Sequence, residues 1–273
     1  MSALGETARK VGRYFDHKAE EYDSRMSQGY YRLLREITWQ HIRPFLPRGK
    51  GARVLDAGGA TGYWSIRLAK AGYHALLLDV SERMLEVAEE NVREAGVSGK
   101  VELCQGDVTD LRDFKEESFD AVLALEEPLS FSSDPEMALA EMALVARPGG
   151  SVAASMLNRF KATHLRKLLK KGDVDELEHF IETGRTYKFS PESGEVVDRR
   201  SFTPEEAEGL FIANGLEIVS TIARPVFANA VAPRLEDREV FSKVLKLEVE
   251  HNSNRSLWGS ADVLEILAQK PEG

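Results

Sequence analysis

Between residues 53 and 156, short apolar runs alternate with longer amphipathic segments. The amphipathic segments predict helices, as where Met84, Ala88 and Val92 recur at helical spacing. Strands and helices that alternate this regularly predict an α/β protein with a doubly wound, mostly parallel sheet and right-handed crossovers. The apolar runs predict buried strands at 54–56, 73–79, 101–105, 119–125 and 151–156.

Helix-start and helix-stop signals support this order. Ser81 follows the second strand and is a good N-cap, while Asp134 precedes a proline that occupies a first helical position. Further along, Thr203 and Glu206 form a capping box, and Gly215 marks a helix end. Two late strands, near 216–222 and 262–269, bring the predicted sheet to seven strands, with a helix at 235–250 between them.

The flanking segments have a different character. Residues 1–48 predict an N-terminal helical cap with an amphipathic aromatic face, which packs over the sheet edge. The alternative is a lid that closes over a ligand, with Tyr14, Tyr22 or Arg35 in contact with it. Residues 49–157 form the predicted core, 158–202 an inserted substrate cover, and 203–273 the C-terminal completion of the sheet.

Composition narrows the function classes. A chain of 273 residues accommodates one α/β unit with additions, and its net charge of −9 argues against a surface that coats nucleic acid. The single cysteine, Cys104, excludes an internal disulfide and a cysteine-rich metal site, and its apolar run favours a buried thiol. No metal-ligand spacing, signal peptide or membrane-spanning run appears, so we expect a cytoplasmic protein that uses no metal. The sequence leaves the oligomeric state open.

A glycine-rich turn follows the first strand, in the run Asp56-x-Gly58-x-x-x-Gly62. Glycines there let backbone amides approach a ligand closely. The run is not the dinucleotide fingerprint, because Ala60 and Tyr63 stand where that motif needs glycine. An acid beside the turn favours a cofactor with an ammonium or sulfonium group over a pyrophosphate.

The next two strands also lead to acids. Asp79 ends the second strand, 17 positions beyond Gly62, and in a parallel sheet it lies beside the first loop, where it can accept both hydroxyl hydrogens of a ribose. Asp107 follows the third strand and can accept from an adenine amino group while Val108 packs on the ring. Met84 either covers the other face of the ring or packs in the core. These strand ends predict a nucleoside-cofactor site.

Together these motifs resemble the class I S-adenosylmethionine-dependent methyltransferases of type 11/25, over about residues 50–157. The resemblance implies a Rossmann-like methyltransferase fold, S-adenosylmethionine as cofactor and S-adenosylhomocysteine as product. Ala60 departs from the pattern, because the family often has glycine there. The resemblance rests on five motifs in the family's order, at 54–62, 79–85, 106–107, 119–125 and 147–150.

The same resemblance implies a role for each matching position. Asp56, Gly58 and Gly62 shape the methionine end of the pocket. Asp79 holds the ribose, and the adenine is framed by Met84, Asp107 and Val108. Leu125 and Glu126 lie near the methyl group, and Tyr22 belongs to a helix that often closes on the cofactor. The predicted cofactor-binding residues are Tyr22, Asp56, Ala57, Gly58, Gly62, Asp79, Val80, Met84, Gly106, Asp107, Val108, Leu125 and Glu126.

Glu126 or Glu127 is the candidate general base, for an acceptor that must lose a proton. The alternative is that these acids only bind substrate or cofactor, or face solvent.

We expect a small-molecule acceptor. A tRNA acceptor is the alternative, because the region after 200 also resembles bacterial methyltransferases that modify a carboxymethoxy group on the tRNA wobble uridine. In that case the six basic residues between 159 and 171 would be part of an RNA footprint. Two further readings are a nicotinamide oxidoreductase and a protein that only senses the cofactor.

Overall fold

The computed structural model of the chain describes residues 4–49 and 51–272. Three helices and a short 3₁₀ turn precede the sheet: α1 (Glu6–Asp16), α2 (Ala19–Met26), α3 (Gly29–Ile42) and η1 (Arg43–Phe45). The alternating core follows as β1 (Arg53–Ala57), α4 (Tyr63–Ala71), β2 (His74–Asp79), α5 (Glu82–Glu94), β3 (Val101–Gln105), β4 (Phe119–Ala124), α6 (Pro128–Phe131), α7 (Pro135–Val145) and β5 (Ala146–Asn158).

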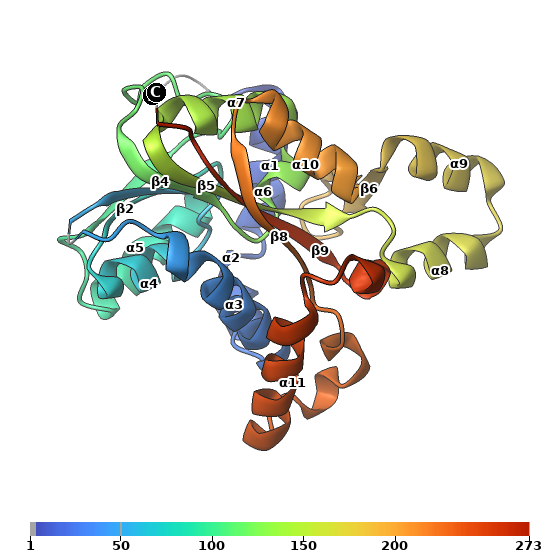
Figure 1. The fold of residues 1–273 in the computed structure, drawn as a ribbon. Helices are drawn as coiled ribbons and strands as arrows, with labels where there is room; N and C mark the ends of the chain where they lie inside the picture. Colours follow the sequence, from blue (N-terminus) through green and yellow to red (C-terminus); the bar gives the residue numbers. More distant parts are fainter. Residues whose placement is uncertain (1–3, 50, 273) are drawn as a thin grey trace.

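Within the described residues, four α-helices and four strands follow, with short 3₁₀ helices between the last of them (Figure 1). They are α8 (Ala162–Lys171), α9 (Val174–Thr183), β6 (Arg185–Phe189), β7 (Val196–Phe202), α10 (Pro204–Ala213), β8 (Glu217–Arg224), α11 (Arg238–His251) and β9 (Val263–Gln269). Helix α11 packs on α3, whereas α8 and α9 form an arm that projects from the body of the molecule (Figure 1).

The sheet has the predicted doubly wound topology. Strands β3, β2, β1, β4 and β5 are parallel neighbours in that order, and β9 and then β8 continue the sheet antiparallel. The strand order reverses direction between β1 and β4. At such a switch point the loops after the neighbouring strands diverge to opposite faces and leave a crevice at the carboxyl edge.

Two features of the sheet differ from the predictions. The strand expected at 151–156 extends from Ala146 to Asn158, because its first residues pair with β4 and its last ones with β7. Through this pairing the β6–β7 hairpin of the inserted segment joins the sheet, so that nine strands rather than seven lie within the described residues. Cys104 is half-buried rather than buried, since β3 is the edge strand.

The helix caps match the sequence signals. Ser81 accepts a hydrogen bond from the amide of Met84, and Asp134 accepts one from Met137. Thr203 and Glu206 form both bonds of a capping box at the start of α10. Each satisfies a backbone donor that the first turn of a helix leaves without a partner.

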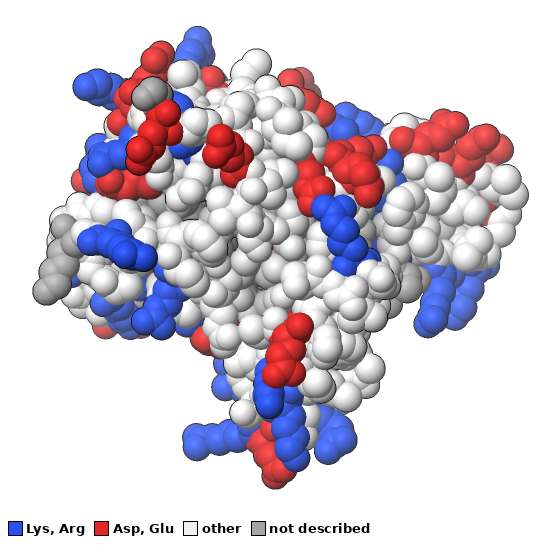
Figure 2. All heavy atoms as spheres, in the orientation of Figure 1, with Lys and Arg blue, Asp and Glu red and all other residues white. Residues whose placement is uncertain are grey.

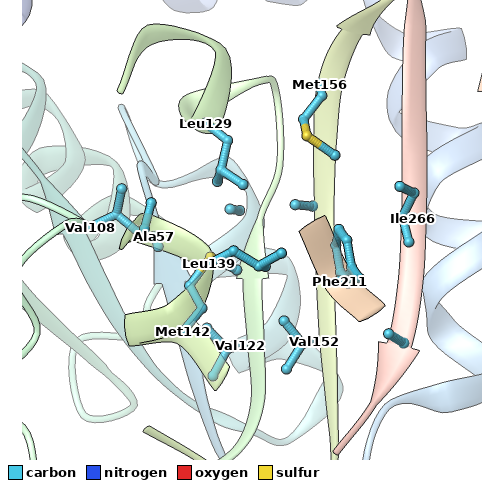
Figure 3. Close-up of a cluster of buried hydrophobic side chains, with 14 of the residues drawn as sticks. Ala57, Val108, Val122, Leu129, Leu139, Met142, Val152, Met156, Phe211 and Ile266 are labelled. Atoms are coloured by element: carbon cyan, nitrogen blue, oxygen red, sulfur yellow. The ribbon is translucent and has the colours of Figure 1, made fainter. Parts of the chain in front are cut away.

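Apolar side chains cover both faces of the sheet. Leu55 of β1 points to the face covered by α7 and α10, while its neighbour Val54 points to the face covered by α4 and α5. Figure 3 shows the first face, where Leu139 and Met142 of α7 and Phe211 of α10 pack on the strands. Burial on both faces explains why these strands are continuous apolar runs.

No helix in the described ranges has the length and apolar character needed to span a bilayer, and the cytoplasmic location stays a prediction.

A buried ionic cluster ties β8, β9 and α3 together. The carboxylate of Glu265, which is fully buried, accepts hydrogen bonds from Thr38 Oγ1 at 2.6 Å and from Arg224 Nε at 2.8 Å, and it contacts His41 Nδ1 at 2.8 Å. Burial by itself raises the pKa of Glu265. The Arg224 charge and the bonds from His41 and Thr38 outweigh that effect and lower the pKa to about 2.

We expect this cluster to make stability depend on pH in the acid range. The folded-state pKa of Glu265 lies below the ordinary value of 4.5, so its contribution is complete above about pH 4.5 and is lost as the pH falls toward 2. At 1.36 kcal/mol per pKa unit, the loss amounts to about 3 kcal/mol. Urea unfolding of wild type and Glu265→Gln at several pH values measures it. Glu102→Gln, on the exposed side of β3, is the control. Parallel curves for wild type and Glu265→Gln between pH 4.5 and 2.5 would contradict the assignment.

Candidate active site

Two adjoining hollows open at the carboxyl edge of the sheet. The first, the strand-end pocket, is bordered by the ends of β1 to β4 and roofed by α1 and α2. Its lining residues are Thr7, Ala8, Val11, Phe15, Tyr22, Gly58, Ala60, Asp79, Val80, Met84, Gly106, Asp107, Val108, Glu126, Pro128, Phe131, Ser132 and Ser133.

The loop after β1 has room for a ligand because of Gly58. This residue has a φ of +78°, and a Cβ built on it would lie 2.5 Å from Cγ of Pro128. The amides of Gly58 and Gly59 both donate to the carbonyl of Leu78, which folds the loop back toward β2. Any side chain at position 58 would therefore have to displace α6.

Asp79 presents its carboxylate to the strand-end pocket. Oδ2 accepts from the amide of Ala60 and Oδ1 from that of Ser81, each at 2.9 Å. Burial raises the pKa of Asp79 to about 6, against the opposing effect of these two backbone donors. Each carboxylate oxygen can accept a further bond, so the pair suits two adjacent hydroxyl groups.

Apolar side chains enclose the rest of this pocket. Val80 and Met84 follow β2, Val108 follows β3, and Phe131 lies on α6. Such walls suit a flat, weakly polar ring. Asp107, at the rim, accepts from the amide of Thr109 at 3.0 Å.

Four of the predicted cofactor residues lie outside the lining of this pocket. Ala57 and Leu125 are in the apolar core, and Gly62, with a φ of +87°, begins α4. Asp56 is 1% exposed and accepts from Ser65 Oγ at 2.6 Å. Burial raises the pKa of Asp56 to about 7. The buried carboxylate of Asp56 thus lies beneath the glycine loop and supports it.

The N-terminal helices close the pocket from above. The α1 residues of the lining are not among the predicted cofactor-binding residues, because their pattern matches ordinary helix packing. Asp16 accepts from Ser81 Oγ and Asp23 accepts from Thr61 Oγ1, both at 2.6 Å. These bonds fasten α1 and α2 to the loops after β2 and β1. Tyr14 packs with Val11 and Val197 and lines neither hollow.

Glu126 is held between two of these helices. Its carboxylate accepts from Tyr22 Oη at 2.9 Å and from Arg35 Nε at 2.7 Å. Burial raises the pKa of Tyr22 well above its ordinary value, and the charge of Glu126 raises it further. Both carboxylate oxygens of Glu126 thus face donors, which holds the side chain in place at the junction of the two hollows.

The second hollow, the basic hollow, adjoins this junction and has about 1040 Å³ of empty space, part of it open to solvent. Six basic and three acidic side chains line it, with several aromatic rings. Its lining residues are Phe15, Tyr22, Arg25, Met26, Tyr30, Tyr31, Leu34, Arg35, Thr38, Trp64, Glu126, Glu127, Phe131, Leu157, Lys161, Lys188, Arg199, Arg224, Asp262 and Val263.

Glu127 differs from Glu126 in its surroundings. Both residues have positive φ, 64° and 70°, which is strained for a residue other than glycine and concentrates at functional sites. Burial raises the pKa of Glu127 to about 7. The negative charge of Glu126 adds to the rise, and Arg224, whose Nη2 lies 4.0 Å away, opposes it. Glu127 can therefore exchange a proton near neutral pH.

Residues 54–150 match a family model described as a methyltransferase domain. The chain contains a class I S-adenosylmethionine-dependent methyltransferase domain. The match spans β1 to the start of β5, which includes all the strand ends of the strand-end pocket. The protein is thus a methyltransferase of this class, with S-adenosylmethionine as cofactor.

Individual relatives extend the likeness beyond this domain. The tRNA 5-carboxymethoxyuridine methyltransferase of Escherichia coli K12 is 24% identical over 95% of this chain and 97% of its own length. The demethylmenaquinone methyltransferase of Clavibacter sepedonicus is 35% identical over 52% of this chain and 56% of its own. Among solved structures, the [4+2]-cyclase SpnF superposes with a TM-score of 0.67 at 20% identity, over 99% of this chain and 98% of its own, which shows the shared fold.

The residues of the strand-end pocket fit the cofactor of the methyltransferase. Asp79 offers two carboxylate oxygens for the ribose hydroxyls, and the apolar walls suit the adenine. The Gly58 turn leaves the space that a Cβ would fill. Which residue binds which part of the cofactor stays a prediction.

We expect Asp79→Asn to weaken cofactor binding at least tenfold, about 1.4 kcal/mol, because the amide replaces an ionised acceptor of two ribose bonds with one acceptor and one donor. Calorimetric titration with S-adenosylhomocysteine measures the affinity. Asp175→Asn, an exposed change on α9, should bind as wild type does. Equal affinity for Asp79→Asn and wild type would refute the ribose assignment.

Proposed function

We propose that the methyltransferase acts on a small-molecule acceptor bound in the basic hollow. One observation carries this proposal. The hollow adjoins the strand-end pocket and shares Phe15, Tyr22, Glu126 and Phe131 with it. An acceptor there meets the cofactor at the Glu126 junction.

The cofactor supplies a methyl group that its sulfonium activates for displacement. The protein then has to orient the acceptor, exclude water and remove a proton where the acceptor carries one. We propose Glu127 as the base, since its pKa of about 7 suits proton transfer at neutral pH. Glu126, fixed between Tyr22 and Arg35, positions the reactants at the junction.

The acceptor class is tested with a cell extract divided into a small-molecule fraction and an RNA fraction. Each is incubated with the protein and cofactor labelled in the methyl group. We expect label in the small-molecule fraction, and at least about tenfold less in reactions that contain the Asp79→Asn variant at limiting cofactor. Label confined to the RNA fraction would overturn the proposal in favour of the second candidate below.

The base assignment predicts a pH dependence. The carboxylate form of Glu127 is the active one, so kcat/KM should rise with pH up to about 7 and then level off. Glu127→Gln should lower kcat about a hundredfold or more, remove this rise, and leave cofactor affinity within twofold. Glu178→Gln, on the exposed side of α9, is the control. If Glu127→Gln keeps both the wild-type rate and the rise, Glu127 is not the base.

A tRNA acceptor is the second candidate, and a specific observation favours it. The tRNA-modifying relative matches 95% of this chain, including the inserted segment, whereas the quinone relative matches about half. Helix α8 also exposes Arg166, Lys167 and Lys170, and no described residue forms an ion pair with them. Figure 2 shows basic side chains on one side of the projecting arm and acidic side chains on the other.

The tRNA candidate predicts salt-dependent binding. If α8 contacts phosphates, a triple variant with glutamine at 166, 167 and 170 should bind tRNA more weakly and with a shallower salt dependence, by about three units of slope. Fluorescence titration of labelled tRNA from 50 to 200 mM salt measures both. The matched control replaces three exposed lysines elsewhere, Lys70, Lys243 and Lys246. A salt response that is flat in wild type would remove this candidate.

A further inference from the structure

We infer that the rim of the basic hollow is an anion-binding subsite, formed by Arg25 of α2, Lys188 of β6 and Arg199 of β7. It holds a carboxylate or phosphate group of the acceptor. The inference rests on the proposed acceptor site and names the chemical class of the molecule that binds there: an organic acid or a phosphate ester.

The fold brings these three side chains to one hollow from distant segments. In the β6–β7 hairpin, Thr186 pairs with Arg199 and Lys188 with Val197. Residues directly opposite each other, and those two positions along, point to the same face of a hairpin, so Lys188 and Arg199 share one face. Val197 packs there against α1, which turns this face toward the N-terminal helices. Arg25 completes the group from α2.

The other three basic residues of the hollow already have carboxylate partners. Arg35 binds Glu126, Arg224 binds Glu265, and Lys161 lies 2.8 Å from Asp262. The hollow therefore has three cations committed to internal ion pairs. Its remaining acid, Glu127, lies 4.0 Å from Arg224.

The three rim cations have no such partner among the described residues. Arg25 packs against the rings of Tyr22 and Tyr31, 5.5 and 5.9 Å from their centroids. Lys188 Nζ lies 5.7 Å from the ring centroid of Tyr14. Arg199 Nε donates only to Thr186 Oγ1, at 3.4 Å. Their donors remain available for an anion.

The neighbouring positive charges repel the charge of Lys188. Partial loss of solvent and the positive charges of Arg199, Lys18 and Arg25 lower the pKa of Lys188 to about 8, although part of its side chain stays exposed. Burial lowers the pKa of Arg199 as well. The negative charge of Glu127 opposes both shifts, but within the described residues it forms no ion pair with Lys188 or Arg199. A bound anion would relieve the repulsion that remains. This concentration of positive charge contrasts with the net charge of −9 of the whole chain.

One uncharged hydrogen-bond donor also lines the hollow. Trp64 is 3% exposed, and its indole Nε1 has no hydrogen-bond partner within the described residues. Buried donors of this kind are rare unless a ligand or water satisfies them. An oxygen of the acceptor would provide that partner, while Tyr31 and Phe131 supply ring faces for its apolar part.

The test measures anion binding separately from catalysis. Protein saturated with S-adenosylhomocysteine is titrated by calorimetry with benzoate, with phenyl phosphate and with uncharged benzamide. We expect one or both anions to bind and benzamide to bind at least tenfold more weakly. The tighter of the two anions identifies a carboxylate or a phosphate as the natural group.

Three variants locate the site: Arg25→Gln, Lys188→Gln and Arg199→Gln. Each should lower anion affinity at least tenfold while the affinity for S-adenosylhomocysteine stays within twofold, which shows that the variants fold. Lys70→Gln, an exposed lysine on α4, should bind anions as wild type does. Unchanged anion affinity in all three variants, or no anion binding by wild type, would overturn the inference.

Failure of the anion-binding subsite and failure of the proposed function give different results. If the variants lose anion binding but the small-molecule fraction is never methylated, the subsite stands and the proposed acceptor class falls. If that fraction is methylated with the same KM by wild type and by all three variants, the acceptor class stands and the subsite falls.

Discussion

The site depends on one constraint, the reversal of strand order between β1 and β4. In a parallel sheet this is the point where loops after neighbouring strands leave in opposite directions, so a crevice opens at the carboxyl edge without any insertion. The turn of Gly58 and the strained pair Glu126 and Glu127 follow strands at that edge, and Asp79 ends one there. Apolar side chains cover both faces of the parallel strands, so the polar groups that follow these strands converge at this edge.

The N-terminal helices turn the open crevice into an enclosed site. Asp16 and Asp23 bind the loops after β2 and β1, and Tyr22 and Arg35 hold the carboxylate of Glu126. One set of bonds therefore positions the roof and orders the acid at the junction of the two hollows. Helix α1 packs on α5 and β7 and also lines the strand-end pocket, and closure of this region as a lid stays a prediction.

Charge is unevenly distributed in this acidic chain. Glu265 anchors Arg224 within the body of the protein, and Arg224 in turn lies near Glu127 in the basic hollow. Glu126 and Arg35 form an ion pair at the junction, whereas the hairpin and α2 contribute cations that have no ion-pair partner among the described residues. The hollow thus has a proton-exchanging acid inside and positive charge at its rim, an arrangement that suits an anionic acceptor.

The sequence by itself determined the parallel core of the sheet, the helix caps and most of the strand-end residues of the strand-end pocket, because hydrophobic periodicity, capping residues and glycine turns are local signals. Asp79, Met84 and Asp107, predicted from these signals, line this pocket, and their contacts with the cofactor stay predictions. Only the tertiary structure decided that Asp56 and Leu125 lie beneath the pocket, that the β6–β7 hairpin joins β5, and that Arg25, Lys188 and Arg199 share one hollow. Those facts depend on contacts between segments up to about 170 residues apart. Contacts of such long range produce no periodic pattern in the sequence from which they could be predicted.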